Sequence, residues 1–335
     1  MIERLISKYR TEIMGLAAIW IAVLHAQMWF RFPLLQAFKL SGQGGVDLFL
    51  FLSGFGLYYA YRKGEHGWTF YKKRLLRILP YYIPAVLARC YYYHYDLTWS
   101  LMFISTYSFW TGFDRSYWYV AAILVLYAIA PLYLRYFNEG REKKMTICAV
   151  LIGLLISVFF WHTTQLIFFA RVPIFFLGFY AGKRAYGNDS SPSFVKWLAP
   201  VLFAAGARIL YLAFKKDGGD EHILYGYGFY WYPNLLIIPP LCLFLSHAFK
   251  WLEGHRVTNV IRGFFYEVGK ASLSVYLLHD MCMRFFGARI HIPASLSYNG
   301  ILLHTIIIVI TLVMSVVYQH VIAFAMNKLT GEHNV

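Results

Sequence analysis

Long apolar runs, separated by short polar segments, occupy most of the 335-residue chain. A helix needs roughly 20 predominantly apolar residues to cross a bilayer, and about ten runs approach that length. The pattern therefore predicts an all-α fold, a polytopic integral membrane bundle of about ten transmembrane helices. The expected spans are Ile13–Phe30, Gly45–Tyr61, Leu75–Tyr93, Trp118–Phe137, Met145–Trp161, Leu166–Gly182, Val195–Phe214, Ile223–Phe249, Ala271–Gly287 and Gly300–Met326.

The stretch Leu97–Phe113 is apolar but interrupted by Ser, Thr and Gly. It is expected either to lie in the membrane interface or to re-enter the membrane, rather than to cross it. The loops between the expected spans are short. Residues 1–335 are therefore expected to form a single transmembrane domain with no separate soluble domain.

Basic residues are divided unequally between the two sets of loops. With the N-terminus inside, the cytoplasmic segments hold about 20 Lys and Arg residues and the opposite loops about 6. Cytoplasmic loops of multi-pass proteins carry such an excess of positive charge. The asymmetry predicts an N-in/C-in, multi-pass protein of the cell (cytoplasmic) membrane.

Composition also favours the bilayer as the surrounding solvent. Hydrophobic residues make up 59% of the chain and charged residues 14%, with a mean hydropathy of +0.51, whereas soluble domains usually carry about a quarter charged residues. The net charge of +15 is spread over short loops rather than one continuous surface, so no nucleic acid is expected as a partner. The four cysteines lack paired metal-ligand spacing, so neither disulfides nor a metal site is expected.

Ionisable residues inside apolar spans are costly to bury and are therefore candidates for function. His25 follows four apolar residues in the outer half of the first expected span. An imidazole can take a hydroxyl proton at neutral pH, which makes His25 a candidate general base. The structural alternative is a buried histidine bonded to a backbone carbonyl. Asp47, at the outer start of the next span, either caps its helix or orients and charge-balances His25.

The second expected span is rich in small residues, including Ser53 and Gly54, which allow a helix backbone or a ligand to approach closely. A basic segment, residues 70–80, follows on the inner side. Positive-inside anchoring explains part of its charge. Arg74 and Arg77, three apart on one helical face, also suit the binding of phosphates.

Several short motifs are distributed along the whole chain. They are Tyr9-Arg10 with His25, Gly45-Val46-Asp47 with Ser53-Gly54-Phe55, Arg77-Ile78-Leu79-Pro80, Trp118-Tyr119 with Tyr127 and Pro131, Arg171-Val172-Pro173-Ile174-Phe175-Phe176-Leu177-Gly178, Gly269-Lys270-Ala271-Ser272 and Tyr276-Leu277-Leu278-His279. Together, in this order and at this spacing, they resemble the membrane-bound acyltransferase family 3.

That resemblance implies a ten-span fold that O-acylates cell-surface carbohydrates with cytoplasmic acyl-CoA. It also implies that His25 is the catalytic histidine of the first span. The family commonly has a basic residue eleven positions before that histidine, where this chain has Met14. Arg10, one helical turn lower on nearly the same face, is the candidate replacement.

The resulting hypothesis is transfer of an acyl group, acetyl by the resemblance, from acyl-CoA to a hydroxyl of an extracytoplasmic or lipid-linked carbohydrate. His25 is the expected general base, and Asp47 is expected to stabilise the imidazolium. Acyl-CoA is a co-substrate, no cofactor is expected to be bound permanently, and the other partner is the lipid bilayer. The expected acyl-CoA-binding residues are Arg10, Ser53, Gly54, Lys73, Arg74 and Arg77. The expected oxyanion- or acceptor-binding residues are Trp118, Arg171, Tyr276 and His279.

Two functions of other classes are the alternatives. A proton-coupled secondary transporter would use His25, Asp47 and His279 as a relay, but the inverted repeats of many transporters are not evident. A sensor or regulatory subunit on the same fold would have no turnover, and the presence of both His25 and Asp47 argues against it. Release of CoA from labelled acetyl-CoA separates the three functions.

Overall fold

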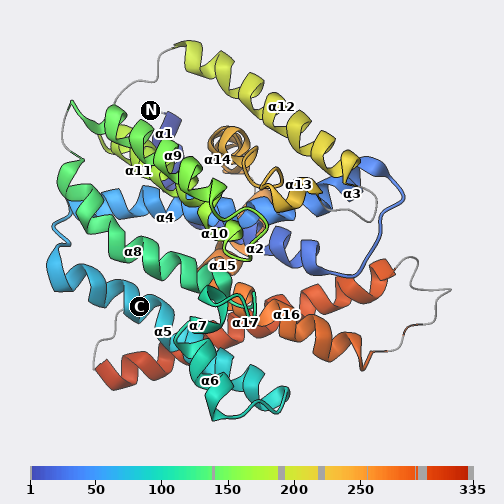
Figure 1. Ribbon diagram of the computed structural model, residues 1–335. Helices are drawn as coiled ribbons and strands as arrows, with labels where there is room; N and C mark the ends of the chain where they lie inside the picture. Colours follow the sequence, from blue (N-terminus) through green and yellow to red (C-terminus); the bar gives the residue numbers. More distant parts are fainter. Residues whose placement is uncertain are drawn as a thin grey trace. The chain divides into compact units, whose positions relative to one another are not determined.

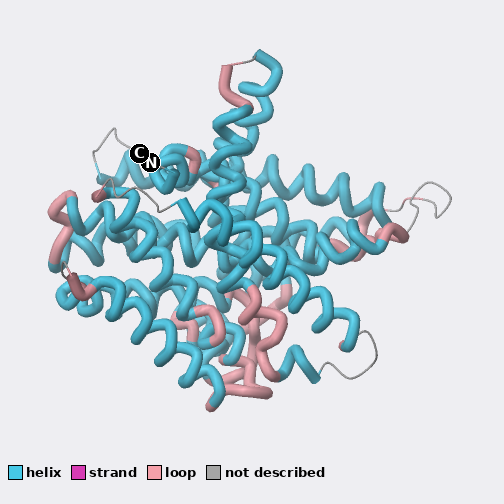
Figure 2. The backbone as a smooth tube through the Cα atoms, turned by 90° about the horizontal axis from the view of Figure 1, so that it is seen from above, coloured by secondary structure: helices cyan, strands magenta, loops and turns pink. Residues whose placement is uncertain are grey.

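The computed structural model describes residues 2–137, 140–187, 193–217, 223–254, 256–290, 292 and 300–330. The protein is 82% helical, and no strand occurs within these ranges. Figure 2 shows the helices joined by loops and turns. The predicted all-α class is confirmed.

The chain divides into two compact units, each built from segments that are distant in sequence. The first unit comprises Met1–Arg10, Val46–Arg74 and Ser105–Gly254. The second comprises Thr11–Gly45, Leu75–Ile104 and His255–Val335. Because their boundaries fall inside helices, three helices contribute to both units: α2 (Arg10–His25), α4 (Gly44–Arg62) and α5 (Gly67–Tyr92).

Besides its parts of the shared helices, the first unit contains nine helices among the described residues. They are α1 (Ile2–Lys8), α7 (Tyr107–Trp110), α8 (Trp118–Tyr136), α9 (Glu142–Val158), α10 (Leu166–Phe169), α11 (Val172–Tyr186), α12 (Ser193–Lys216), α13 (Ile223–Gly226) and, completing the set, α14 (Asn234–Trp251), of which α7, α10 and α13 are single turns. The second unit contains α3 (Pro33–Leu40), the 3-10 turn η1 (Ser41–Gln43), α6 (Leu97–Ile104), α15 (Arg256–Lys270), α16 (Ser272–Gly287) and α17 (Ile301–Thr330).

Glycines bring α4 and α11 into backbone contact within the first unit. A Cβ added at Gly54 would lie 2.1 Å from the carbonyl oxygen of Phe175, and one added at Gly178 would lie 2.1 Å from that of Phe51. No larger residue fits either place without moving a helix backbone. Small residues at such crossings are the usual basis of helix packing where the surrounding solvent is lipid.

The second unit uses the same device where α2 crosses α15. A Cβ at Gly15 would lie 2.0 Å from the Phe265 carbonyl oxygen, and one at Gly269 would lie 1.9 Å from that of Thr11. Elsewhere in this unit α16 packs along α17, as Figure 1 shows for the two helices nearest the C-terminus. The close contact leaves α2 little freedom to slide or rotate against α15.

Five helices in the described part of the chain are long and apolar enough to cross a membrane. They are Trp118–Tyr136, Leu166–Tyr186, Trp197–Lys216, Asn234–Trp251 and Ile301–Leu329. On the last of these, large apolar side chains that are 54–72% exposed follow one face: Val309, Val313, Val317, Val321 and Phe324. An exposed apolar stripe of this kind suits contact with lipid. The count of about ten spans and the N-in/C-in orientation stay predictions.

The first expected span, Ile13–Phe30, ends earlier than its apolar pattern indicated. The helix α2 stops at His25, and Ala26 turns back to bond the carbonyls of Ala22 and Val23. Pro33 then opens α3 and holds Phe32 in extended backbone. His25 is consequently a helix-terminal residue with an exposed side chain, rather than one buried within a span.

Other elements also differ from the expected ones. The expected span Leu166–Gly182 is interrupted between α10 and α11, where Pro173 lies in the first turn of α11. The broken stretch Leu97–Phe113 forms two short helices, α6 and α7. The expected cytoplasmic loop before Ala271 contains α15, which the sequence interpretation missed.

Candidate functional site

The first unit holds a buried ion pair between Asp47 and Arg171. The Nε of Arg171 donates to the two carboxylate oxygens at 3.2 and 3.3 Å, and the side-chain amide of Asn234 donates to Oδ2 at 2.7 Å. Both charged side chains are 1% exposed. Charges at such depth require pairing and hydrogen bonds. The cluster therefore ties α4, α11 and α14 together.

Two indole rings enclose the guanidinium of Arg171. Its Cζ lies 4.9 Å from the Trp118 ring and 5.2 Å from the Trp231 ring, and Nη1 donates to the Ile167 carbonyl at 3.1 Å. Tryptophan faces stabilise a desolvated cation. The structure thus brings together Trp118 and Arg171, two of the expected oxyanion- or acceptor-binding residues, in surroundings that favour a role for Arg171 in holding Asp47.

The sequence interpretation did not single out Asn234 or Trp231. The signal available for Asn234 was a lone amide after Pro233 at the start of an apolar helix. Its bond to Asp47 joins residues 187 positions apart. No local pattern carries that pairing.

Two expected acyl-CoA-binding residues, Ser53 and Gly54, are part of α4, and a third, Arg10 of α2, contacts that helix. The Nε of Arg10 donates to the Leu52 carbonyl at 3.1 Å. Ser53 is buried and hydrogen-bonds the side chain of Tyr119, while Gly54 contacts the backbone of α11. The contact of Gly54 is thus one of helix packing, and Arg10 is placed directly beside this part of α4.

Lys73 and Arg74, expected to bind the phosphates of CoA, are ion-paired with Glu65. The Nζ of Lys73 lies 2.9 Å from Oε1, and Arg74 bonds Oε2 and stacks on Phe70 at 4.4 Å. Partial burial alone would raise the pKa of Glu65. The hydrogen bonds from Lys73 and Arg74 outweigh it and hold that pKa below its usual value of 4.5. Arg77, one turn further along α5, is exposed.

In the second unit the imidazole of His25 has two contacts of different kinds. Its Nδ1 is hydrogen-bonded to the Ile21 carbonyl oxygen at 3.0 Å. Its ring meets that of His279, with the centroids 4.7 Å apart and the planes 62° apart. Since a carbonyl only accepts, Nδ1 carries the proton of the neutral ring, and Nε2 holds the basic lone pair.

His279 is held more firmly than His25. It is 5% exposed on α16, and its Nδ1 is hydrogen-bonded to the carbonyls of Tyr276 at 2.6 Å and Val275 at 3.2 Å. The Tyr276 ring lies 5.9 Å away, centroid to centroid. By the same argument as for His25, the Nε2 of His279 is the nitrogen with the lone pair.

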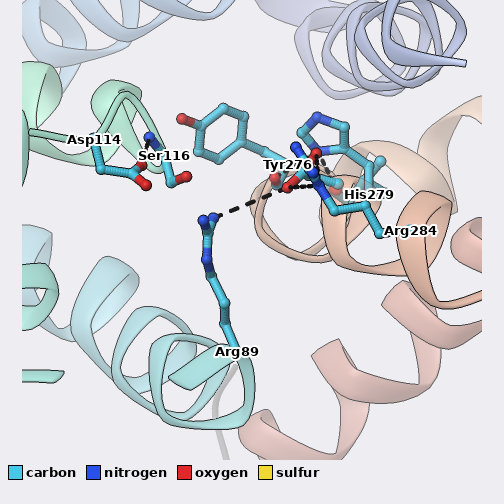
Figure 3. Close-up of polar contacts among 8 residues, drawn as sticks. Arg89, Asp114, Ser116, Tyr276, His279 and Arg284 are labelled. Atoms are coloured by element: carbon cyan, nitrogen blue, oxygen red, sulfur yellow. Dashed lines mark hydrogen bonds and ion pairs between the residues drawn. The ribbon is translucent and has the colours of Figure 1, made fainter. Parts of the chain in front are cut away.

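A charged cluster lies on the same helix as His279. The Nε of Arg284 is 3.2 Å from both carboxylate oxygens of Asp280, and Arg89 approaches Oδ2 from α5 at 3.9 Å. Figure 3 shows Arg89 directed from its own helix toward the one that carries Tyr276, His279 and Arg284. Asp280 is thereby engaged by two cations.

The expected site residues therefore fall into distinct local groups. The structure brings His25 to His279 and Tyr276, and Asp47 to Arg171 and Trp118. The pairing of Asp47 with His25 stays a prediction. Among the residues described, no group of three or more His, Cys, Asp or Glu side chains is arranged to hold a metal ion.

The sequence that carries these residues matches the model of a known protein family. The family model for an acyltransferase domain, Acyl_transf_3, matches residues 15–320. The chain belongs to the acyltransferase 3 family. No curated protein and no solved structure matches it.

Membership of the acyltransferase 3 family confirms the resemblance seen in the motifs. The matched range contains His25, Asp47, Arg171 and His279, and so includes residues of both local groups. Arg10 precedes it. The family and the apolar helices together identify the protein as a multi-pass membrane acyltransferase.

Proposed function

We propose that the protein transfers an acyl group, acetyl in the simplest case, from acyl-CoA to a hydroxyl of an extracytoplasmic or lipid-linked carbohydrate, with His25 as general base. The observation that carries this proposal is the exposed imidazole of His25 at the end of α2, in a chain whose acyltransferase domain extends over residues 15–320. Its Nδ1 is bonded to the Ile21 carbonyl. The bond selects the tautomer with a basic Nε2.

The proposed reaction assigns each proton and each bond. The Nε2 of His25 takes the proton of the acceptor hydroxyl while the hydroxyl oxygen attacks the thioester carbonyl. The C–S bond then breaks, and the thiolate of CoA takes the proton back from the imidazolium. His25 is suited to the charged stage because it ends α2, where the helix dipole favours a cation.

Basic residues at the start of α5 are the proposed site for the phosphates of CoA. Arg74 and Arg77 share one helical face, and a guanidinium binds phosphate oxygens with two hydrogen bonds. Glu65 holds Lys73 and Arg74 in place. Arg10, beside Leu52 on α4, is proposed to contact the pantetheine arm, and Ser53 is proposed to lie along it.

The test is release of the CoA thiol from labelled acetyl-CoA by the purified protein in membrane vesicles. His25→Ala is expected to fold and to lose transfer by about 100- to 10,000-fold, the range for a general base. His247→Ala is the matched control, because His247 bonds the carbonyl four residues before it in the same way. Near-normal transfer by His25→Ala would remove His25 from the chemistry.

The contact between His25 and His279 also suits the proton relay of a secondary transporter. Such a protein would move its substrate, together with protons, across sealed vesicles without CoA. Transport without CoA, in the absence of thiol release, would replace the acyltransfer proposal.

A further inference from the structure

We infer that His279 is the positioning residue for His25, holding its ring and stabilising its positive charge through the Nε2 edge. This inference rests on the proposed function of His25 as general base. Both residues belong to the second unit, so the group that positions the proposed base lies in the same unit as the base.

The two rings differ in how tightly they are held. His25 is at the last residue of α2 with an exposed side chain, fixed by one hydrogen bond to Ile21. His279 is buried in the middle of α16 and bonded to two backbone carbonyls. A ring at a helix end gains a defined orientation when it rests against one that cannot move. The rigid His279 therefore sets the direction of the His25 lone pair.

The chemistry of His279 adds a second effect. Because its Nδ1 proton is committed to the carbonyls of Tyr276 and Val275, its Nε2 presents a lone pair. When His25 takes the hydroxyl proton, a cation forms 4.7 Å from this neutral ring, centroid to centroid. The lone pair on Nε2 attracts that cation. A phenylalanine at the same place would supply packing without the nitrogen.

The charged neighbours of His279 are already engaged. Asp280 is paired with Arg284 and Arg89, and consecutive helical residues point in directions about 100° apart. His279 contacts the His25 ring, while Asp280 is directed to its own cations.

Three substitutions separate the atoms of His279. His279→Phe keeps a ring and removes both nitrogens. His279→Asn places a polar atom where Nδ1 stands, and His279→Gln places one where Nε2 stands, because the bond counts from Cα are the same. A backbone-anchoring role predicts rescue by Asn, whereas the role inferred here predicts rescue by Gln.

The measurement is kcat and KM for labelled acetyl-CoA, with thiol release as the readout. We expect His279→Phe and His279→Asn to lower kcat about 10- to 100-fold, the loss that follows from misplacing a reacting group, with KM changed less than about twofold. His279→Gln should recover several-fold of the loss. The control His247→Gln should leave both constants unchanged.

The outcomes distinguish the inference from the proposed function. If His25→Ala is inactive while all three His279 variants turn over like the wild type, the inference is wrong and the base remains. Recovery by Asn and not by Gln, or loss of folding by all three variants with thiol release per folded molecule preserved, would assign His279 to structure alone. If His25→Ala is active, the proposed function itself fails.

Discussion

The ion pair Asp47–Arg171 and the imidazole pair His25–His279 show two ways of placing polar groups inside an apolar protein. In the ion pair, opposite charges and an added amide occupy the carboxylate oxygens, and tryptophans cover the guanidinium. In the imidazole pair, two rings of the same kind are in contact, and the Nδ1 of each is hydrogen-bonded to a backbone carbonyl of its own helix. The first arrangement satisfies the bonding capacity of its charges. The second leaves a lone pair on the Nε2 of each ring, as the proposed proton transfer requires.

The comparison teaches that depth of burial alone does not select between candidate catalytic groups and structural ones. Arg171 is among the most completely buried large side chains of the described residues, yet its bonds are those of a structural anchor. His25 is exposed at a helix end, as a group that must meet a substrate needs to be. The following predictions test this division.

The largest effect on stability is expected from Asp47→Ala. The change leaves the charge of Arg171 buried without its carboxylate, which costs about 3–5 kcal/mol of unfolding free energy. Unfolding in mixed micelles measures it. The double variant Asp47→Ala with Arg171→Met should lose less than the sum of the two single losses. Normal stability with abolished acyl transfer would instead place Asp47 in the chemistry, as the sequence hypothesis has it.

A smaller loss is expected from Gly178→Ala. The added methyl would lie 2.1 Å from the Phe51 carbonyl oxygen, so α4 and α11 must separate, at a cost of about 1–3 kcal/mol. Gly263→Ala is the matched control, because a Cβ at Gly263 meets nothing within 4 Å. Equal unfolding free energies for the two variants would contradict the backbone contact between these helices.

Basic side chains at the start of α5 should act on ligand binding more than on stability. Arg74 is 12% exposed and ion-paired with Glu65, and Arg77 is exposed. Arg74→Ala combined with Arg77→Ala is expected to weaken acetyl-CoA binding about tenfold or more, since charge-assisted bonds to phosphate are lost, while kcat changes little. Titration calorimetry measures the affinity. Lys72→Ala, on another face of the same helix, serves as control. An unchanged dissociation constant in the double variant would move the nucleotide site elsewhere.

The smallest effect is expected at Glu65. Its folded pKa is depressed by Lys73 and Arg74, so the ion pairs stabilise the protein above the unfolded pKa and are lost as pH falls through the lower, folded one. Because Lys73 is 57% exposed, the contribution is below about 1 kcal/mol. Wild type and Glu65→Gln should therefore differ slightly at pH 7 and converge once the pH is below the folded pKa of Glu65. A constant difference across this range would exclude the ion pairs as its cause.

Sequence alone predicts much of the helical framework, because runs of apolar residues require a regular backbone that satisfies its own hydrogen bonds in lipid. It fails where a helix ends inside an apolar run, as α2 does at His25. It also missed α15, whose apolar residues Val257, Val260, Ile261 and Phe264 recur at helical spacing. Their number is too small to signal a span, and the segment was interpreted as a basic loop.

The sequence predicts which residues are candidates for the site, but it does not predict which of them contact one another. His25, Asp47, Arg171 and His279 stand out because ionisable groups are rare in apolar helices. Which of them meet depends on contacts between distant segments: His25 and His279 are 254 positions apart along the printed sequence. The contact between the two imidazole rings is visible only in the folded structure.

The tight crossing at Gly15 also works as an angular reference for the imidazole that ends the same helix. With Gly15 seated on the Phe265 carbonyl, the azimuth of every later side chain of α2 is determined by residue count alone. Deleting one residue between Gly15 and His25 would turn the ring by about 100°, away from His279. The direction of the proposed base therefore depends on the number of residues between Gly15 and His25, which a deletion changes without altering any polar residue.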